Sequence, residues 1–331
     1  MNIRRILNKF IVRVCSRLQM ERVYGKPLSA IFEMSSRCNL KCTLCNTGAL
    51  KDEFPGVERG NMTFHTFSAG LDKLLPEVES ILLYNWGEPF YNKDLYKCIE
   101  YATGRGVETQ LSTNMMLYKP EDGSKLISSG LTKLVVSCDG LTQQSYEKYR
   151  QGGNLEKVIA HTRNLIAQKV STGSAFPRIV MQFIVFRHNE HEREAFKAFW
   201  EKEGVDEVNF IRMSYVSRQG REVAQKLDFV PTDPAFQPFH PYGKMKRCGE
   251  FYGHATIDWN GDWYTCCFPS GMKEYKLGNL VSDDFWSVWN GEKYRYCRRV
   301  IKRQKVIGRS FETMCHDCAG VFPEGAKKYW S

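Results

Sequence analysis

Apolar and polar residues follow two alternating patterns along most of this chain. Short runs rich in β-branched and other apolar residues predict six strands, at 30–34, 81–85, 108–112, 134–137, 179–186 and 208–212. Longer segments with apolar residues at helical spacing predict helices between them, at 64–75, 94–103, 119–128, 155–168 and 191–203. Successive strand–helix units predict an α/β fold with a parallel sheet wrapped by helices, closed or partly closed as a barrel.

Polar or glycine-containing sequences follow the first four predicted strands. They are a cysteine-rich loop at 35–46, then Trp86-Gly87-Glu88-Pro89, then Ser112-Thr113-Asn114, and then Ser137-Cys138-Asp139-Gly140. Because α/β barrels build their sites at the carboxyl ends of the strands, we expect these sequences to share one face.

The pattern changes from about residue 230, where four prolines mark a linker, Pro231, Pro234, Pro238 and Pro241. Residues 255–258 and 262–266 flank Asn260-Gly261, which predicts a β-hairpin with a type I′ turn. We therefore expect a basic arm at 1–27, a barrel at 28–235 and a small cysteine-bearing domain at 236–331.

Composition is that of a globular protein, with 42% hydrophobic and 25% charged residues in 331, which excludes general disorder. Basic residues interrupt the N-terminal apolar positions, and no run reaches membrane-spanning length, so neither a secretory signal nor a transmembrane helix is expected. These features predict a cytoplasmic protein. In that reducing compartment its 12 cysteines bind metal more readily than they pair.

The net charge of +10 is unevenly distributed. Residues 1–27 carry seven Lys and Arg against one acid, Glu21. A second basic stretch comprises Arg298, Arg299, Lys302, Arg303, Lys305 and Arg309. Such runs bind nucleic acid, anionic membranes or phosphorylated substrates, or simply form solvated helix faces.

The arm also carries apolar residues at helical spacing, namely Ile3, Ile6, Leu7, Phe10, Val14 and Leu18. This pattern predicts an amphipathic helix that either lies on a membrane surface or docks on the protein's own barrel. Both alternatives stay open, and the first would make the protein peripheral to the membrane.

Cys38, Cys42 and Cys45 follow the first strand at the spacing C-x3-C-x2-C. Three thiolates can bind three irons of a cubane cluster and leave the fourth iron open for another ligand. The alternative is a zinc knuckle completed by a distant residue.

The sequence CNLKCTLC after the first strand and WGEP after the second resemble those of the radical SAM superfamily. The resemblance implies a partial (β/α)6 barrel in which Cys38, Cys42 and Cys45 ligate a [4Fe-4S] cluster. It implies that S-adenosylmethionine (SAM) chelates the open iron and is cleaved reductively to a 5′-deoxyadenosyl radical, which takes a hydrogen atom from substrate. A low-potential electron donor such as flavodoxin or ferredoxin is then an expected partner.

The same resemblance implies which residues contact SAM. They are Gly87 and Glu88 at its amino group, and Ser112, Asn114, Ser137, Asp139 and Arg150 at its ribose or carboxylate. The chain departs from the family at two places: Leu44 stands where an aromatic residue over the adenine is usual, and WGEP replaces GGEP. The alternative for Glu88 is a surface acid in a Gly-Pro turn.

The C-terminal part resembles the SPASM/Twitch extension of the superfamily. Cys248, Gly261 and Cys266 match its C-x(9–15)-G-x4-C opening, and Cys315 and Cys318 follow. These four cysteines imply one auxiliary [4Fe-4S] cluster, as in the Twitch version. The alternatives are Cys267 in place of Cys266, and a structural zinc site.

No catalytic acid, base or hydrogen donor is assigned, and the weak candidates are Cys138, Asp139 and Cys297. Strand alternation predicts Cys138 on the helix side of the sheet, and we expect Cys297 to fill space near the auxiliary site unless it is a spare ligand.

The sequence favours a polar and, from the basic excess, anionic small-molecule substrate: a sugar, aminoglycoside or nucleotide sugar that is dehydrogenated, epimerised or joined through a carbon–carbon bond. Three alternatives remain. A ribosomal-peptide maturase is disfavoured because only the short arm precedes the barrel, and an RNA-modifying enzyme because no RNA-binding module is visible. The third is a non-catalytic metal-binding scaffold.

Overall fold

One continuous sheet of nine strands organises the protein. The computed structural model describes residues 3–54, 56–214, 218–238, 248–268, 270–303, 313 and 315. The strand order is β6-β5-β4-β3-β2-β1-β7-β8-β9. The bounds are β1 Ser29–Phe32, β2 Ser80–Leu82, β3 Glu108–Thr113, β4 Lys133–Ser137, β5 Arg178–Val185, β6 Glu207–Arg212, β7 His254–Ile257, β8 Asp262–Tyr264 and β9 Gly278–Asn279.

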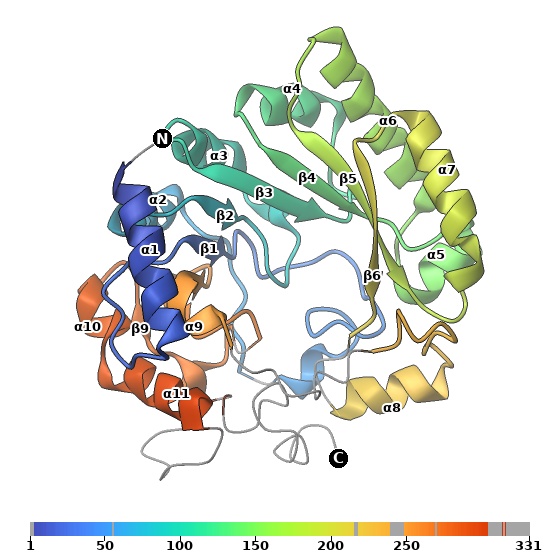
Figure 1. Ribbon diagram of the computed structural model, residues 1–331. Coiled ribbons are helices and arrows are strands. Elements are labelled where there is room, and N and C mark those ends of the chain that lie inside the picture. The colour runs from blue at the N-terminus through green and yellow to red at the C-terminus, as the bar shows by residue number, and fades with distance from the viewer. Residues whose placement is uncertain are drawn as a thin grey trace.

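Strands β1 to β6 are parallel, and each pairs with the next along the chain. Helices cover the outer face of the curved sheet, which is open on one side (Figure 1). The predicted α/β partial barrel is confirmed, and all six predicted strands are present. Their ends shift by up to three residues, most at β2, which stops at Leu82.

The helices in the described part of the chain are α1 Ile3–Arg17, α2 Phe64–Leu74, α3 Leu95–Thr103, α4 Pro120–Ser128, α5 Gln143–Tyr149, α6 Leu155–Ser171, α7 Arg193–Glu203, α8 Arg218–Lys226, α9 Glu250–Gly253, α10 Phe285–Trp289 and α11 Glu292–Arg303. The five predicted helices between strands all form, whereas α5 was not predicted because seven residues carry little periodicity. None of these helices is long and apolar enough to cross a bilayer.

Helix α2 illustrates how the sequence builds the core. The Thr63 hydroxyl accepts the Thr66 N–H and caps the first turn. Phe67, Leu71 and Leu74 are fully buried because their spacing of three to four residues places them on one helix face. That face packs on the sheet, where the Phe67 ring meets Phe32 of β1 edge-on.

The cysteine-bearing domain continues the barrel's sheet. Strand β7 pairs in parallel with β1 from Ser29 opposite His254 to Phe32 opposite Ile257, so the sheet runs across the predicted boundary at residue 235. The predicted hairpin of β7 and β8 forms, but its type I′ turn is wrong. Of its two central residues only Gly261 has a positive φ, of 87°, and its N–H donates to Asp258 O, as in a type I turn closed by a left-handed glycine.

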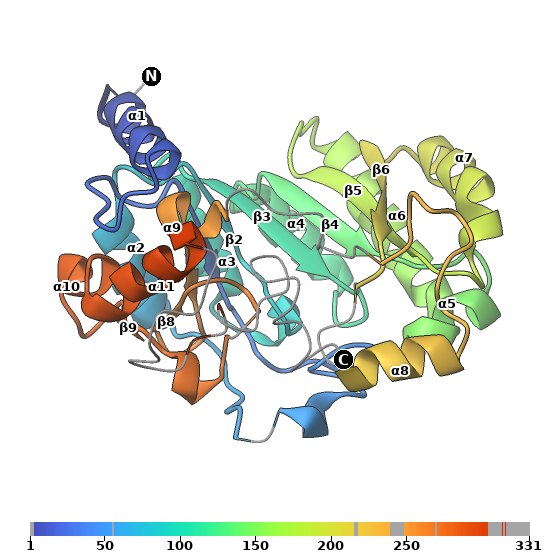
Figure 2. The same cartoon turned by 60° about the horizontal axis from the view of Figure 1, so that its bottom comes forward.

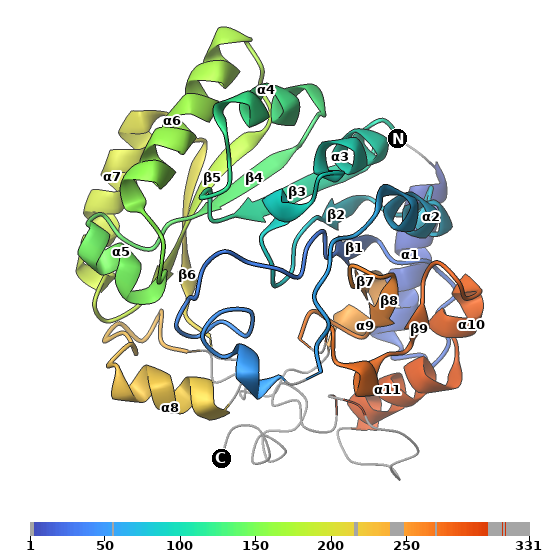
Figure 3. The ribbon, with the colours of Figure 1, turned by 180° about the vertical axis from the view of Figure 1, so that it is seen from behind.

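The segment between β1 and α2 crosses the open side of the sheet and approaches α8 (Figure 3). Its leucines Leu40 and Leu44 are buried in a second hydrophobic cluster with Tyr149, Phe186 and Phe229. This cluster joins α5, the end of β5 and the segment after α8, and it fixes the cysteine loop against the barrel.

Candidate functional site

The three-cysteine loop is anchored to the end of α5. The N–H groups of Lys41 and Thr43 donate to the carbonyls of Gln151 and Tyr149, at 3.0 and 3.1 Å. Arg59 secures the other side of the loop, because its guanidinium donates to Ser36 O, Asn46 O and Thr47 Oγ1 at 3.1–3.2 Å. The backbone of the loop is therefore fixed from two directions.

Each of the three sulfurs has a hydrogen-bond donor near it. The Thr47 N–H donates to Cys45 Sγ at 3.4 Å, Asn114 Nδ2 to Cys38 Sγ at 3.7 Å, and Arg150 Nη1 lies 4.0 Å from Cys42 Sγ. Burial raises the pKa of the Cys38 thiol to about 12 and that of Cys42 to about 11. Metal coordination reverses this effect, since a coordinating thiol is deprotonated outright.

The WGEP turn packs directly on the backbone that leads into the cysteine loop. A Cβ atom on Gly87 would lie 1.8 Å from Ser35 O and 2.8 Å from Arg37 O, so only glycine fits there. The Glu88 N–H donates to Arg37 O at 2.7 Å. The two loops therefore share one backbone contact surface.

The Glu88 side chain is buried and accepts hydrogen bonds from three donors. Its carboxylate accepts from Thr113 Oγ1 and the Asn114 N–H, both at 2.8 Å, and from the Phe90 N–H at 3.3 Å. Burial raises the pKa of this carboxyl to about 7. Glu88 thus fixes the end of β3 beside the cysteines and is not a surface acid. Its contact with the SAM amino group stays a prediction.

Asp139 and Arg150 form a buried ion pair behind Cys42. Arg150 Nε donates to Asp139 Oδ2 at 2.5 Å, and the Ile184 N–H donates to Asp139 Oδ1 at 2.6 Å. Burial lowers the pKa of Arg150, but Asp139 and the Cys42 sulfur more than reverse this, so the pKa lies well above its usual value and the guanidinium stays charged. Asp139 therefore positions Arg150.

Ser112 and Ser137 lie on the inner face of the sheet, on the neighbouring strands β3 and β4. Cys138 points to the opposite side, where it is fully buried in the main core and its Sγ donates to Gly140 O at 3.6 Å. The structure places this thiol as the strand alternation predicts, among core side chains. Leu44 is buried in the second cluster.

Glu33, at the end of β1, is a site residue that the sequence did not reveal. Its two carboxylate oxygens accept the N–H groups of Asn85 and Trp86 at 3.2 and 2.7 Å, which positions the WGEP turn. Complete burial raises its pKa to about 8, and Asp258 adds to the rise. The acidic residue at the end of an apolar strand could have indicated a functional role for Glu33. No local sequence pattern indicated the role of Arg59.

The auxiliary cysteines gather beside this turn. The Trp86 indole N–H and Asn85 Nδ2 both donate to Cys267 O, at 2.9 and 3.1 Å. Next to it, Cys266 is partly buried, and desolvation together with the adjacent thiols of Cys267, Cys315 and Cys248 raises its pKa well above the usual value.

Cys297 lies beside Cys315 within the same group of thiols. Its sulfur is fully buried, lies 3.3 Å from Thr313 Oγ1 and hydrogen-bonds Cys315. Both its predicted roles, filler and spare ligand, agree with this place. The remaining predicted ligand, Cys318, lies outside the described residues.

The two sets of thiols fit clusters of several irons. In the part of the chain that the structure describes, no three His, Cys, Asp or Glu side chains converge to bind a single metal ion. The sulfurs of a cubane cluster need not converge in that way, because each binds a different iron. None of the described cysteines forms a disulfide, so no sulfur is used up in that way.

Comparison with protein families decides what this site is. The radical SAM superfamily model matches residues 32–199, half of the chain. The chain belongs to the radical SAM superfamily. The SPASM model, an iron-sulfur cluster-binding domain, matches residues 248–319. This radical SAM protein is therefore an enzyme. Its cofactors are SAM, a [4Fe-4S] cluster and auxiliary iron–sulfur, which the SPASM domain binds. When bound, the first cluster supplies the electron that cleaves SAM.

Individual proteins resemble the whole chain more distantly. Mycofactocin maturase MftC of Mycobacterium ulcerans is 24% identical over 310 residues, which cover 85% of this chain and 79% of that protein. Fe-coproporphyrin III synthase of Methanosarcina barkeri is 27% identical over 203 residues, 61% of this chain and 48% of that protein. The structure of Streptococcus suis SuiB bound to precursor peptide SuiA matches with a TM-score of 0.60 and 17% identity, covering 86% of this chain and 69% of that one.

Proposed function

We propose that this radical SAM enzyme is a maturase that abstracts a hydrogen atom from a carbon of a peptide substrate. The observation that carries the proposal is the similarity to mycofactocin maturase, which extends over 85% of the chain and so reaches well beyond the barrel. This similarity supports the peptide alternative better than the small-molecule substrate that the sequence favoured.

The inner face of the sheet supports a peptide ligand. Ser137 of β4 lies opposite Gln182 of β5, which lies opposite Asn209 of β6, so three neutral polar side chains form one row across the sheet. Their neighbours Val136, Cys138, Met181 and Phe183 are fully buried on the helix side, which directs the row inward. Hydroxyl and amide groups both donate and accept, as the amides of a peptide require.

The edge of β6 offers a second means of binding an extended peptide. Strand β6 ends the sheet, and no strand in the described part of the chain pairs with its outer edge. This outer edge faces the open side of the barrel (Figure 1), where an extended peptide could pair with it as an added strand.

The test follows the abstracted hydrogen atom. Reconstituted enzyme is incubated anaerobically with SAM and reductant, and with either a deuterated precursor peptide encoded beside the gene or a deuterated mixture of sugars and aminoglycosides. We expect deuterium in 5′-deoxyadenosine from the peptide only, with a matching change in peptide mass. Deuterium from the sugar arm alone would refute the proposal and favour the small-molecule substrate. A Cys38→Ala variant controls for label exchange without SAM cleavage.

A further inference from the structure

Helix α1 is docked on the barrel through one of its faces. Asn8, Val12 and Cys15, spaced by three or four residues, are buried. The Asn8 side chain exchanges two hydrogen bonds with the Lys26 backbone, at 2.8 and 3.0 Å. Arg5 donates to Pro76 O and Gly106 O at 2.9 and 2.8 Å. Helix α1 therefore docks on the protein's own barrel, which was one of the two predicted alternatives.

The opposite face of α1 is apolar as well, and it points to solvent. Its exposed residues are Ile3, Ile6, Leu7 and Phe10, with Leu18 just beyond the helix end, and 45 to 78% of each is accessible. At about 100° per residue these positions and Val14 fall within an arc of about 120°, which also includes Arg17 at its C-terminal end. Docking thus leaves a second apolar stripe uncovered by any described residue.

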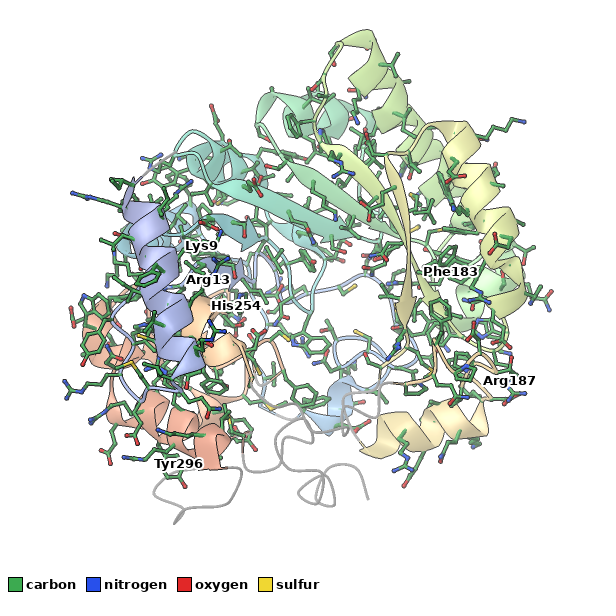
Figure 4. The ribbon with its side chains drawn as sticks, in the orientation of Figure 1. Lys9, Arg13, Phe183, Arg187, His254 and Tyr296 are labelled. Atoms are coloured by element: carbon green, nitrogen blue, oxygen red, sulfur yellow. The ribbon has the colours of Figure 1, made fainter. Side chains whose placement is uncertain are left out.

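Positive charge lies at one margin of this stripe and near its C-terminal end. Arg13 and Arg17 are exposed, and neither has an ion-pair partner among the described residues. Lys9, one turn before Arg13, pairs with Glu79 at 2.8 Å instead. Figure 4 labels Lys9 and Arg13 along α1. A stripe of apolar residues with unpaired arginines is complementary to a surface that is both hydrophobic and anionic.

The position of α1 leaves the site accessible. The carbonyls that Arg5 contacts, Pro76 and Gly106, precede β2 and β3, so the helix lies at the amino ends of the strands. The cysteine loop and the WGEP turn follow the carboxyl ends. Figure 2 shows α1 projecting at one corner of the molecule, away from α8, which lies near the cysteine loop.

We propose that the outward face of α1 binds an anionic membrane surface. A helix of 15 residues is about 22 Å long. A stripe about 10 Å wide on it offers roughly 220 Å², well below the ~800 Å² per partner of a standard protein interface. Lipid requires no such minimum area, because acyl chains surround each inserted side chain and anionic headgroups attract the neighbouring arginines.

The test is flotation of the full chain with vesicles of phosphatidylcholine alone or mixed with phosphatidylglycerol. We expect flotation with the anionic vesicles only, weakened by high salt. Leu7→Glu/Phe10→Glu should abolish it, and Arg13→Gln/Arg17→Gln should weaken partitioning about 25-fold, at roughly fivefold per arginine. The control is Val170→Glu on α6, which alters an equally exposed apolar residue and should float like wild type.

Two results would overturn the proposal. One is absence of wild-type flotation with anionic vesicles, and the other is undiminished flotation of both double variants. Light scattering on the same samples identifies a protein partner: a dimer that Leu7→Glu/Phe10→Glu dissociates, without lipid binding by wild type, assigns the stripe to a second copy. All substituted side chains are exposed, so unchanged melting temperatures separate loss of the surface from loss of the fold.

Discussion

Replacing Gly87 by alanine tests whether the WGEP turn and the cysteine loop act as one unit. The added Cβ would lie 1.8 Å from Ser35 O and 2.7 Å from Ser35 C. Restoring an ordinary carbon–oxygen contact of about 3.3 Å moves the two backbones apart by about 1.5 Å. Neither neighbour is a flexible side chain, so the displacement falls on the segment leading to Cys38 or on Glu88 and the end of β3.

A displacement of that size is large for catalysis. A misplacement of about 1 Å costs roughly 100-fold in rate, equivalent to about 2.7 kcal/mol of transition-state stabilisation. We therefore expect Gly87→Ala to lower 5′-deoxyadenosine formation at least 100-fold under reductant. Because Arg37 O also loses the 2.7 Å hydrogen bond from the Glu88 N–H, bound iron at the first cluster should fall too.

The assay combines iron content after anaerobic reconstitution with SAM cleavage measured by chromatography. The matched control is Gly253→Ala, whose Cβ would meet the Val12 side chain at an ordinary 3.5 Å, and which should match wild type within twofold. If Gly87→Ala retains wild-type iron and cleaves SAM within threefold of the wild-type rate, the two loops do not depend on this contact and the reasoning fails.

Three further predictions address the surroundings of the clusters. Arg59→Gln removes most of the hydrogen bonds that the guanidinium donates to Ser36 O and two other oxygens of the cysteine loop. The first cluster of this variant should therefore lose iron to a chelator faster than that of wild type. Equal rates of iron loss would show that these hydrogen bonds do not stabilise the loop. Cys266→Ser should lower bound iron from about eight to about four per chain and the neighbouring Cys267→Ser should not; the reverse assigns Cys267 as ligand. Glu33 has a pKa of about 8 when folded against 4.5 otherwise, so it contributes stability below pH 4.5 that is lost as pH rises toward 8. The melting temperature of Glu33→Gln should therefore fall less than that of wild type between pH 5.5 and 8.5; parallel curves exclude Glu33 as the titrating group.

The sequence predicted best those features that depend on local periodicity. The alternation along β4 placed Cys138 on the helix side, and the structure buries it there completely. The order of strands followed from the order of β/α units, because each parallel connection returns the chain beside the strand that it left. The spacing of Cys38, Cys42 and Cys45 predicted a cluster site, and this prediction needs no tertiary information because the three residues lie on one loop.

The features that escaped prediction depend on contacts between distant segments. Pairing of β7 with β1 joins residues more than 200 positions apart, and no periodicity encodes it. The hairpin turn depends on Asn260, which can adopt either sign of φ and here keeps a negative one. Arg298 was expected within a basic stretch, yet it is fully buried. Its guanidinium donates to Phe251 O and Glu21 O and lies over the rings of Trp289 and Tyr294, each 4.7 Å away.

The residues around the sulfurs show how one side chain makes two contacts and keeps a third donor. Arg150 was predicted to meet the SAM carboxylate, and the structure uses its Nε for Asp139 and its Nη1 near Cys42 Sγ. Neither contact occupies Nη2, so a planar guanidinium fixed by Asp139 keeps a donor for a carboxylate bound beside the cysteines. A lysine has no such fork and could not serve both at once. The pairing with Asp139 therefore explains why arginine suits this position whether its principal role is toward sulfur or toward SAM.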